Sequence, residues 1–360
     1  MNTQFLQIDI EHPQPSQITA AAEIIKAGGL VAFPTETVYG LGGNALDPKA
    51  AGKIYAAKGR PSDNPLIAHI ADREELDALV AEIPPAAEVL MERYWPGPMT
   101  LVFPKPDKVP YGTPGGLDPV AVRMPSHPVA RALIREAGVP IAAPSANLSG
   151  RPSPTKAEHV YEDMNGRIDM ILDGGEVGIG LESTIIDVTS ETPSLLRPGF
   201  ISEEMLRDVL GQVEVDAASV GPIDPEAHPK APGMKYRHYA PKADMSIIRG
   251  PQEAVVDRIC VMAARALGKG KKVGIVCTEE SLEIYRERLA GIGEAALLDL
   301  AVIGSRREPA TIAHNLFDVL RSFDGRQVDR IYSESFEGGQ LGDAIMNRLK
   351  KAAGYHIVDV

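Results

Sequence analysis

The sequence predicts an α/β protein with two domains. Short apolar runs of strand length alternate with longer segments that repeat their apolar residues at helical spacing. The 34 glycines and 30 prolines gather between these segments, where turns and helix ends are expected. A length of 360 residues and a hydrophobic content of 44% allow each domain its own core.

The end of the second predicted strand carries the first candidate ligand groups. Residues 5–10 are predicted to form a strand, and Ser16 to cap a helix that ends at the glycines 28 and 29. The apolar run 30–33 is the second strand, which stops at Pro34. The following segment, TETVYGLGG, offers hydroxyls and exposed amides where α/β sheets bind ligands, so Thr35 is a candidate.

A short helix follows and leads into a cationic loop. Asp47 is predicted to cap this helix, which begins with a proline and runs to about residue 57. The loop KGRPSDNP places Lys58, Arg60 and Ser62 together in a pocket suited to phosphate. An alternative is that the two cations only complement the negative end of the helix dipole.

The next segment contains an isolated arginine and a second strand end of the same design. Helices are expected over 72–83, 85–95 and 128–136, and strands over 99–103, 120–123 and 141–143. Arg123 closes the strand VAVR, where it would bind a carboxylate or form a structural salt bridge. Ser145 and Asn147 follow the last strand as donors at the sheet edge or as ordinary turn residues.

The first domain is predicted to span residues 1–216. Its remaining strands are expected over 170–172, 183–188 and 194–196, and Ser202 caps a helix that ends near residue 210. Residues 217–242 lack periodicity and combine cations, histidines and tyrosines with prolines. We interpret them as a linker that docks over the first domain as a lid, with a passive tether as the alternative.

The second domain, residues 243–360, alternates strands and helices again. Strands are expected over 245–248, 273–277, 297–300 and 330–332, and helices over 252–267, 282–289, 310–323 and 343–353. This order indicates a smaller Rossmann-like α/β domain with a mainly parallel sheet. The glycines at 338–342 open the last helix, and helix packing explains them as well as an anion site does.

Charge and cysteine content argue against several classes of protein. The net charge of -12 disfavours general binding to nucleic acid or to an anionic membrane. Cys260 and Cys277 form no CxxC motif or Cys/His cluster, so a zinc finger and a disulfide framework are not expected. Because no leader segment and no apolar run of about 18 residues is visible, we expect a cytoplasmic protein without membrane contact.

A series of short motifs resembles a known family. The first domain contains, in order, PTETVYGLG, KGRP with SDNPL, WPGPMT, VAVRMP, PSANLSG, ESTIID and RPG. This series resembles the YrdC-like domain of threonylcarbamoyl-AMP synthases. The linker PGMKYRHYAP and the closing AIMNRLKKAA resemble the long, two-domain form of that family. The resemblance implies a twisted mixed sheet with helices in the first domain.

The resemblance implies an enzyme that condenses L-threonine, bicarbonate or CO2, and ATP to threonylcarbamoyl-AMP with release of pyrophosphate. Its product would pass to the tRNA threonylcarbamoyl transferase machinery, for the threonylcarbamoyladenosine modification of tRNA. Positioning and charge neutralisation must supply the catalysis, because the threonine amine and then the carbamate oxygen are the nucleophiles. Mg2+ is expected on the triphosphate, with no metal ligand from protein side chains.

The resemblance also implies roles for individual residues. The catalytic group on the ATP phosphates is expected to be Lys58, Arg60, Ser145 and Asn147. The residues expected beside the nucleotide are Ser62, Ser153, Arg197 and, in the linker, Tyr236. The residues expected on the threonine side are Thr35, His69, Arg123 and Ser183. Among these, Arg123 would hold the carboxylate, which suits its planar guanidinium.

Two other classes remain open. One is an RNA-binding module, since the domain resembles concave folds once interpreted as double-stranded RNA binders. The negative charge argues against this class and against direct tRNA binding. The other is the carbamoyltransferase of hydrogenase maturation, which also carries a YrdC-like domain. That protein has zinc-finger cysteines, and two isolated cysteines do not provide them.

Overall fold

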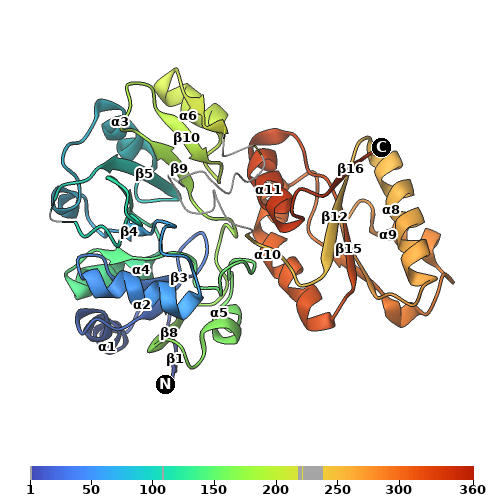
Figure 1. Ribbon diagram of the computed structural model, residues 1–360, viewed down its shortest axis with the longest axis horizontal. Coiled ribbons are helices and arrows are strands. Elements are labelled where there is room, and N and C mark those ends of the chain that lie inside the picture. Colours follow the sequence, from blue (N-terminus) through green and yellow to red (C-terminus); the bar gives the residue numbers. More distant parts are fainter. Residues whose placement is uncertain (1, 108, 218–220, 222–237) are drawn as a thin grey trace. The chain divides into compact units, whose positions relative to one another are not determined.

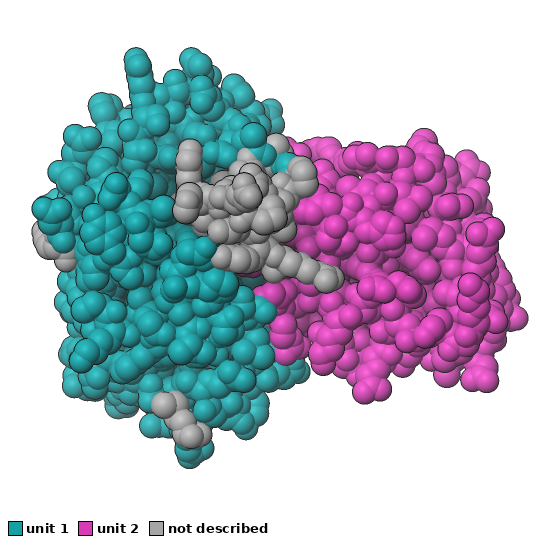
Figure 2. Space-filling view, viewed as in Figure 1, with its two compact units in different colours: residues 1–149, 153–236 teal, residues 150–152, 237–360 magenta. Residues whose placement is uncertain are grey.

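The computed structural model describes residues 2–107, 109–217, 221 and 238–360. The chain divides into two compact units (Figure 2). Unit 1 comprises Met1–Ser149 and Ser153–Tyr236, and unit 2 comprises Gly150–Pro152 and Arg237–Val360. The boundaries at 216 and 242 stay predictions, because most of the expected linker lies outside the described residues.

Unit 1 is built on a mixed sheet of eleven strands in the order β1-β8-β2-β3-β7-β4-β6-β5-β9-β10-β11 (Figure 1). The strands are β1 (Gln4–Gln7), β2 (Val31–Phe33), β3 (Gly40–Asn44), β4 (Ile67–His69), β5 (Met99–Pro104), β6 (Pro119–Arg123), β7 (Ile141–Ala142), β8 (Met170–Asp173), β9 (Thr184–Asp187), β10 (Ser194–Arg197) and β11 (Glu214–Val215). β4 runs parallel to β6 and antiparallel to β7, which confirms the expected mixed sheet.

Six α-helices are described in unit 1, and four of them begin with proline. They are α1 (Pro15–Lys26), α2 (Pro48–Lys58), α3 (Pro85–Tyr94), α4 (Pro128–Ala137), α5 (Ala157–Met164) and α6 (Glu203–Leu210). Proline suits a first helical position because the N–H that it lacks would have no partner there. The predicted caps at Asp47 and Ser202 are confirmed, since their side chains accept from Lys49 N and Met205 N.

Two apolar clusters hold the helices of unit 1 on the sheet. In one cluster, α1 and α4 contact each other through residues such as Ile25 and Leu133, together with Val31 of β2. In the other cluster, Ile54 of α2 and Leu90 of α3 pack with residues of the central strands. The ends of the central strands therefore lie on a well-packed base, as a precise binding site requires.

Several local predictions were wrong. Ser16 does not cap α1, because Pro15 already starts the helix and its N-cap is Gln14. The helix expected over 72–83 is a short 3-10 helix, η1 (Arg73–Ala78), because Ala81 N already bonds to Pro104 O. The glycines after Tyr39 form β3 instead of exposing their amides, because β3 pairs with β2 and β7. Helix α5 was not anticipated.

Unit 2 contains a five-stranded sheet in the order β14-β13-β15-β12-β16, with every pairing parallel. Its strands are β12 (Asp244–Arg249), β13 (Val273–Cys277), β14 (Leu298–Val302), β15 (Arg330–Glu334) and β16 (Ile357–Asp359), and η2 (Ala295–Leu297) precedes β14. Its helices are α8 (Gln252–Leu267), α9 (Leu282–Leu289), α10 (Pro309–Arg326) and α11 (Gly339–Ala352).

The helices of unit 2 cover both faces of its sheet. Figure 1 shows α8 and α9 on one face and α10 and α11 on the other. Two packed layers of helix around a parallel sheet confirm the predicted Rossmann-like α/β domain. No helix in the described part of the chain is long and apolar enough to span a membrane.

Candidate functional site

The sheet of unit 1 brings the two predicted strand ends together. β3 pairs with β2 on one side and with β7 on the other. At the start of β3, Gly40 forms an antiparallel bridge with Ser145, and Ala146 N donates to Tyr39 O at 2.8 Å. The segments that follow β2 and β7 are therefore neighbours, although more than a hundred residues separate them in the sequence.

Lys58, Ser145 and Asn147 form one group, which we name the Lys58 cluster. Lys58 is the last residue of α2, and Gly59 ends the helix in the left-handed region at φ 62°. The Lys58 side chain is buried, and its Nζ donates to the backbone oxygens of Ser145 and Asn147, both at 2.5 Å. Ser145 Oγ donates to Asn147 Oδ1 at 2.5 Å. The cationic loop and the PSAN segment thus meet at one ammonium group.

Arg60 is fixed within its own loop. Its guanidinium donates to Asn64 Oδ1 at 2.6 Å and to Pro65 O at 2.9 Å. Ser62 is exposed in the turn between these residues. Both residues therefore follow Lys58 closely along the chain, on a loop that Arg60 itself stiffens.

Glu36, Thr37 and Arg123 form a second group, which we name the Arg123 cluster. Arg123 Nη2 lies 2.7 Å from Glu36 Oε1, and Arg123 Nη1 donates to Thr37 Oγ1 at 2.9 Å. The Arg123 side chain is 5% exposed and the Glu36 side chain 14%. The carboxylate partner that the sequence predicted for Arg123 is thus present within the protein itself.

Burial and charge determine the ionisation of this cluster. Burial alone would raise the pKa of Glu36, but the adjacent Arg123 guanidinium holds that pKa below its ordinary value. Burial lowers the pKa of His127, while the Glu36 charge acts in the opposite direction. His127 Nδ1 is buried without a hydrogen-bond partner among the described residues. A charged Glu36–Arg123 pair therefore lies beside a histidine whose positive charge is disfavoured.

Thr35 and His69 lie next to the Arg123 cluster. Thr35 Oγ1 lies 2.8 Å from Thr37 Oγ1 and donates to Val38 O at 2.6 Å, so Thr35 shapes the turn after β2. His69 lies opposite Arg123 in the parallel β4–β6 register. Burial, with the Arg123 charge, lowers the pKa of His69 to about 3, and its Nδ1 lies 3.0 Å from Ile67 O. His69 is thus a neutral hydrogen-bonding group.

Ser183 links the Arg123 side of the sheet to Arg197. Thr100 lies opposite Arg123 in the β5–β6 register, and its Oγ1 is 2.7 Å from Ser183 Oγ. Arg197 donates to Ser183 O at 3.0 Å and to Ser183 Oγ at 3.1 Å. Ser153 Oγ donates to Glu182 Oε1 at 2.5 Å, one residue before Ser183. Two residues expected beside the nucleotide therefore lie around a residue expected on the threonine side.

Tyr236 lies outside the described residues, and so does most of the predicted lid. Two side chains at the site, Thr100 and His127, were absent from the expected site residues. Glu36 and Thr37 lie in the segment that was expected to carry ligand groups but had no assigned role, although Glu36 is the single acid in the run PTETVYGLGG. An isolated charge in a segment of hydroxyls, glycines and apolar residues is the signal that could have identified it, since such a charge needs a partner when buried.

The glycines of β3 let an aromatic ring cover this strand. A Cβ atom at Gly42 would lie 2.8 Å from Phe33 Cε1 and 2.7 Å from Ile141 Cγ2. The Phe33 ring therefore lies against a strand face without side chains. It meets the His69 ring edge to face, with 6.3 Å between the ring centres. The glycines of the GLGG sequence thus allow the Phe33 ring to pack closely against β3 beneath the site.

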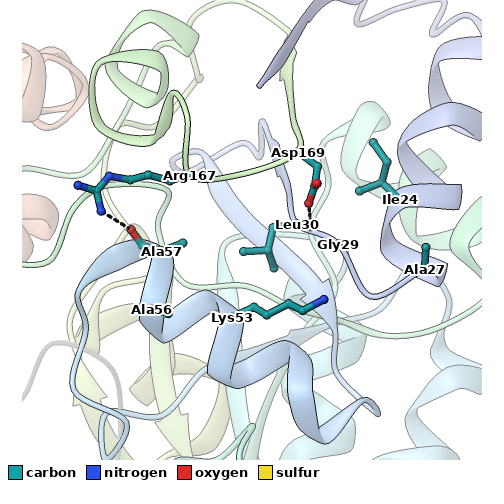
Figure 3. Close-up of a pocket in the computed structure, with 9 residues that line it drawn as sticks. All are labelled: Ile24, Ala27, Gly29, Leu30, Lys53, Ala56, Ala57, Arg167 and Asp169. Atoms are coloured by element: carbon teal, nitrogen blue, oxygen red, sulfur yellow. Dashed lines mark hydrogen bonds between the residues drawn. The ribbon is translucent and has the colours of Figure 1, made fainter. Parts of the chain in front are cut away.

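A separate cavity of about 680 Å3 lies between α1, α2 and the segment before β8 (Figure 3). Its polar groups hold the local backbone. Lys53 donates to Gly28 O, Arg167 donates to Ala57 O at 3.4 Å, and Asp169 accepts from Leu30 N at 2.8 Å. None of the predicted site residues lines this cavity. The candidate site is therefore formed by the two clusters and not by this cavity.

Two family models match adjacent parts of the chain. The Sua5, YciO and YrdC family model, described as telomere recombination, matches residues 23–199. The model described as threonylcarbamoyl-AMP synthase, C-terminal domain, matches residues 201–354.

Similar proteins cover nearly the whole chain. Threonylcarbamoyl-AMP synthase from Pyrococcus abyssi is 50% identical over 344 residues, which are 96% of this chain and 96% of that protein. The Bacillus subtilis enzyme of that name is 49% identical over 95% of this chain and 94% of its own. The crystal structure of P. abyssi Sua5 complexed with L-threonine matches with a TM-score of 0.90 and 48% identity, covering 99% of this chain and 100% of the other. The chain belongs to the threonylcarbamoyl-AMP synthase family, in its two-domain form.

Proposed function

We propose that the protein condenses L-threonine, bicarbonate or CO2, and ATP to threonylcarbamoyl-AMP, with release of pyrophosphate. The product then serves the threonylcarbamoyladenosine modification of tRNA through a downstream transferase machinery. The observation that carries this proposal is that one sheet positions both a buried ammonium group, Lys58, held by backbone oxygens, and a nearly buried carboxylate–guanidinium pair, Glu36 and Arg123. The first suits a triphosphate and the second an amino acid.

The Lys58 cluster supports ATP binding. An ammonium group held by two backbone oxygens keeps a defined position, so that it can meet phosphate oxygens without reorganisation. We assign Lys58, Arg60, Ser145 and Asn147 to the phosphates, and Ser62, Ser153, Arg197 and Tyr236 to the remainder of the nucleotide. The bonds of Arg197 to Ser183 favour a position for Arg197 between the two substrates.

The Arg123 cluster supports threonine binding. The similar P. abyssi protein was crystallised with L-threonine, which makes this amino acid the natural substrate to assign here. We assign Arg123 to the threonine carboxylate, with Thr35, His69 and Ser183 around the rest of the molecule. His69 has its pKa lowered to about 3, so it presents a neutral ring to the substrate.

The reaction needs positioning more than it needs a protein nucleophile. The threonine amine attacks the carbon of CO2, and the carbamate oxygen then attacks the α-phosphorus of ATP as pyrophosphate leaves. Mg2+ would neutralise charge on the triphosphate. Within the described residues, no group of three His, Cys, Asp or Glu side chains is arranged as metal ligands. We assign the phosphates as the ligands of this ion.

Mass spectrometry of the products tests the proposal. The protein is incubated with ATP, L-threonine, bicarbonate and Mg2+, and each component is omitted in turn. We expect threonylcarbamoyl-AMP and pyrophosphate only from the complete mixture. Formation of ADP, or of an adenylate without bicarbonate, would contradict the proposed reaction.

A further inference from the structure

The Arg123 cluster has a property that carboxylate binding by Arg123 does not explain. In the protein alone, both terminal nitrogens of the guanidinium are engaged, one by Glu36 and the other by Thr37. A substrate carboxylate must therefore share or replace a carboxylate that already lies there. The pair is nearly buried, so water cannot compensate a charge that is left behind.

The Glu36–Arg123 contact is close. The two charged atoms lie 2.7 Å apart. The Arg123 charge, a hydrogen bond from Arg123 and the backbone groups of Glu36 and Ser126 all favour the charged form of the Glu36 carboxylate. No bond to Glu36 Oε1, Glu36 Oε2 or Arg123 Nη2 meets strict hydrogen-bond geometry among the described residues, so a better-aligned group of a ligand can replace the present contacts.

A zwitterion is the ligand that fits this arrangement. Its carboxylate can replace Glu36 on Arg123, while its ammonium group compensates the Glu36 charge. A ligand with only a carboxylate would leave Glu36 buried and unpaired, which is strongly unfavourable.

We propose that Glu36 binds the α-ammonium group of the substrate, and that the Glu36–Arg123 pair opens to admit the zwitterion. This inference rests on the proposed function and adds a specificity-determining residue to it. One buried ion pair is exchanged for two, so the total charge of the site stays balanced. The site would therefore select an amino acid over the corresponding hydroxy acid.

The neighbours of Glu36 agree with this role. The lowered pKa of Glu36 keeps its carboxylate charged, as an ammonium partner requires. Burial lowers the pKa of His127, so this ring does not compete as a cation for Glu36. Thr37 already donates or accepts through its hydroxyl and carries no charge. Arg123 is thus the cation that holds Glu36 until the substrate arrives.

The competing explanation is that Glu36 only positions Arg123. Replacing it would then weaken every ligand that uses Arg123 by the same factor. The two explanations therefore predict different relative affinities of the Glu36 variant for two ligands that each carry a carboxylate. Suitable ligands are L-threonine and (2S,3R)-2,3-dihydroxybutanoate, in which a hydroxyl group replaces the ammonium group.

The experiment is isothermal titration of both ligands into the full-length protein and its Glu36→Gln variant. We expect the wild-type protein to prefer threonine by about tenfold or more, as for a charge-assisted contact. In Glu36→Gln this preference should fall to about twofold, through weaker threonine binding and unchanged or tighter binding of the hydroxy acid. Glu82→Gln is the matched control, since it removes the same charge from an exposed side chain and should preserve the preference.

The outcomes separate this inference from the function on which it rests. An equal loss for both ligands in Glu36→Gln, or unchanged threonine binding, would overturn the role of Glu36 while leaving synthesis of the adenylate intact. A wild-type protein that neither binds threonine nor forms product would instead reject the proposed function. If Glu36→Gln unfolds, Glu36→Asp keeps the charge on a shorter side chain. We then expect weaker threonine binding with the preference retained, and a lost preference would contradict the inference.

Discussion

The Lys58 and Arg123 clusters bury a cation in two different ways. Lys58 Nζ is held by backbone oxygens of Ser145 and Asn147, which carry partial charge only. Arg123 is held by the full negative charge of Glu36. The first cluster therefore places a full charge against partial charges of the backbone, whereas the second places two full charges of opposite sign together.

This difference matches the two substrates that we propose. A polyanion such as ATP gains from an ammonium group that is held at a fixed position. An amino acid is neutral overall, and a charge-balanced pair can receive both of its ends without a net change of charge. The four predictions that follow test whether the two clusters are functionally distinct, and they run from the largest expected effect to the smallest.

Loss of Lys58 should have the largest effect. We expect Lys58→Ala to reduce adenylate formation by about 100-fold or more, because it removes the charge at the centre of the first cluster. Pyrophosphate release at saturating threonine measures the effect. Lys49→Ala is the control, since Lys49 is exposed at the start of the same helix and should leave the rate unchanged. Normal adenylate formation in Lys58→Ala would reject the assignment of this cluster to ATP.

Loss of Arg123 should weaken the binding of threonine much more than the binding of ATP. We expect Arg123→Ala to raise the KM for threonine by about 30-fold and the KM for ATP by less than about threefold. The variant also leaves Glu36 buried without its partner, which should lower the free energy of unfolding by about 3 kcal/mol. The double variant Glu36→Gln/Arg123→Ala should regain part of this stability in thermal unfolding. An equal rise of both KM values would contradict the division of roles.

An added methyl group should destabilise the protein at Gly42 of β3 but not at Gly52 of α2. Gly42→Ala places a Cβ within 2.8 Å of Phe33, so we expect a loss of about 1–3 kcal/mol in the free energy of unfolding. Gly52→Ala in α2 meets no atom within 4 Å, and we expect a gain of about 0.5–1 kcal/mol because alanine favours helix. Denaturant unfolding measures both variants. Equal effects would show that β3 does not need its glycine there.

The ionisation of His69 should report the charge of its neighbour Arg123. Its pKa is lowered to about 3, so NMR should show no titration of this ring between about pH 5 and pH 8. Below about pH 6.5 the unfolded chain binds a proton at His69 that the folded chain does not bind. His69 therefore makes stability fall as the pH decreases from about 6.5 towards 3. In Arg123→Ala the pKa should rise, and a midpoint near 6.5 in the wild-type protein would contradict this account.

The sequence predicted elements whose signals are local. Asp47 before a proline and Ser202 before two glutamates specify helix starts through bonds to residues two or three positions later. In unit 2, the expected bounds 252–267, 273–277 and 282–289 agree with those of α8, β13 and α9. Such signals act within one turn or one strand, so they do not depend on the rest of the fold.

The sequence missed elements whose stability depends on distant neighbours. The GLGG segment has low strand propensity, yet Gly40–Asn44 is a strand because β2 and β7 provide its hydrogen bonds and the Phe33 ring covers it. The short helix α5 buries Val160 and Met164 in the core of unit 1. The core residues that these two side chains contact lie outside the eight residues of the helix, so the local sequence does not reveal them. Tertiary packing overrode local preference at both places.

By itself, the sequence determined the α/β class, most helix starts, and the residue types able to bind phosphate and carboxylate. Only the tertiary structure decided which of these residues share a site. The register of β4, β5 and β6 places His69, Arg123 and Thr100 in one row, and the bridge at Gly40 brings Ser145 to Lys58. The tertiary structure also decided that Glu36 is the carboxylate that pairs with Arg123. The reason is physical, since a partner for a buried charge is selected by distance in space, and the order of residues does not encode that distance.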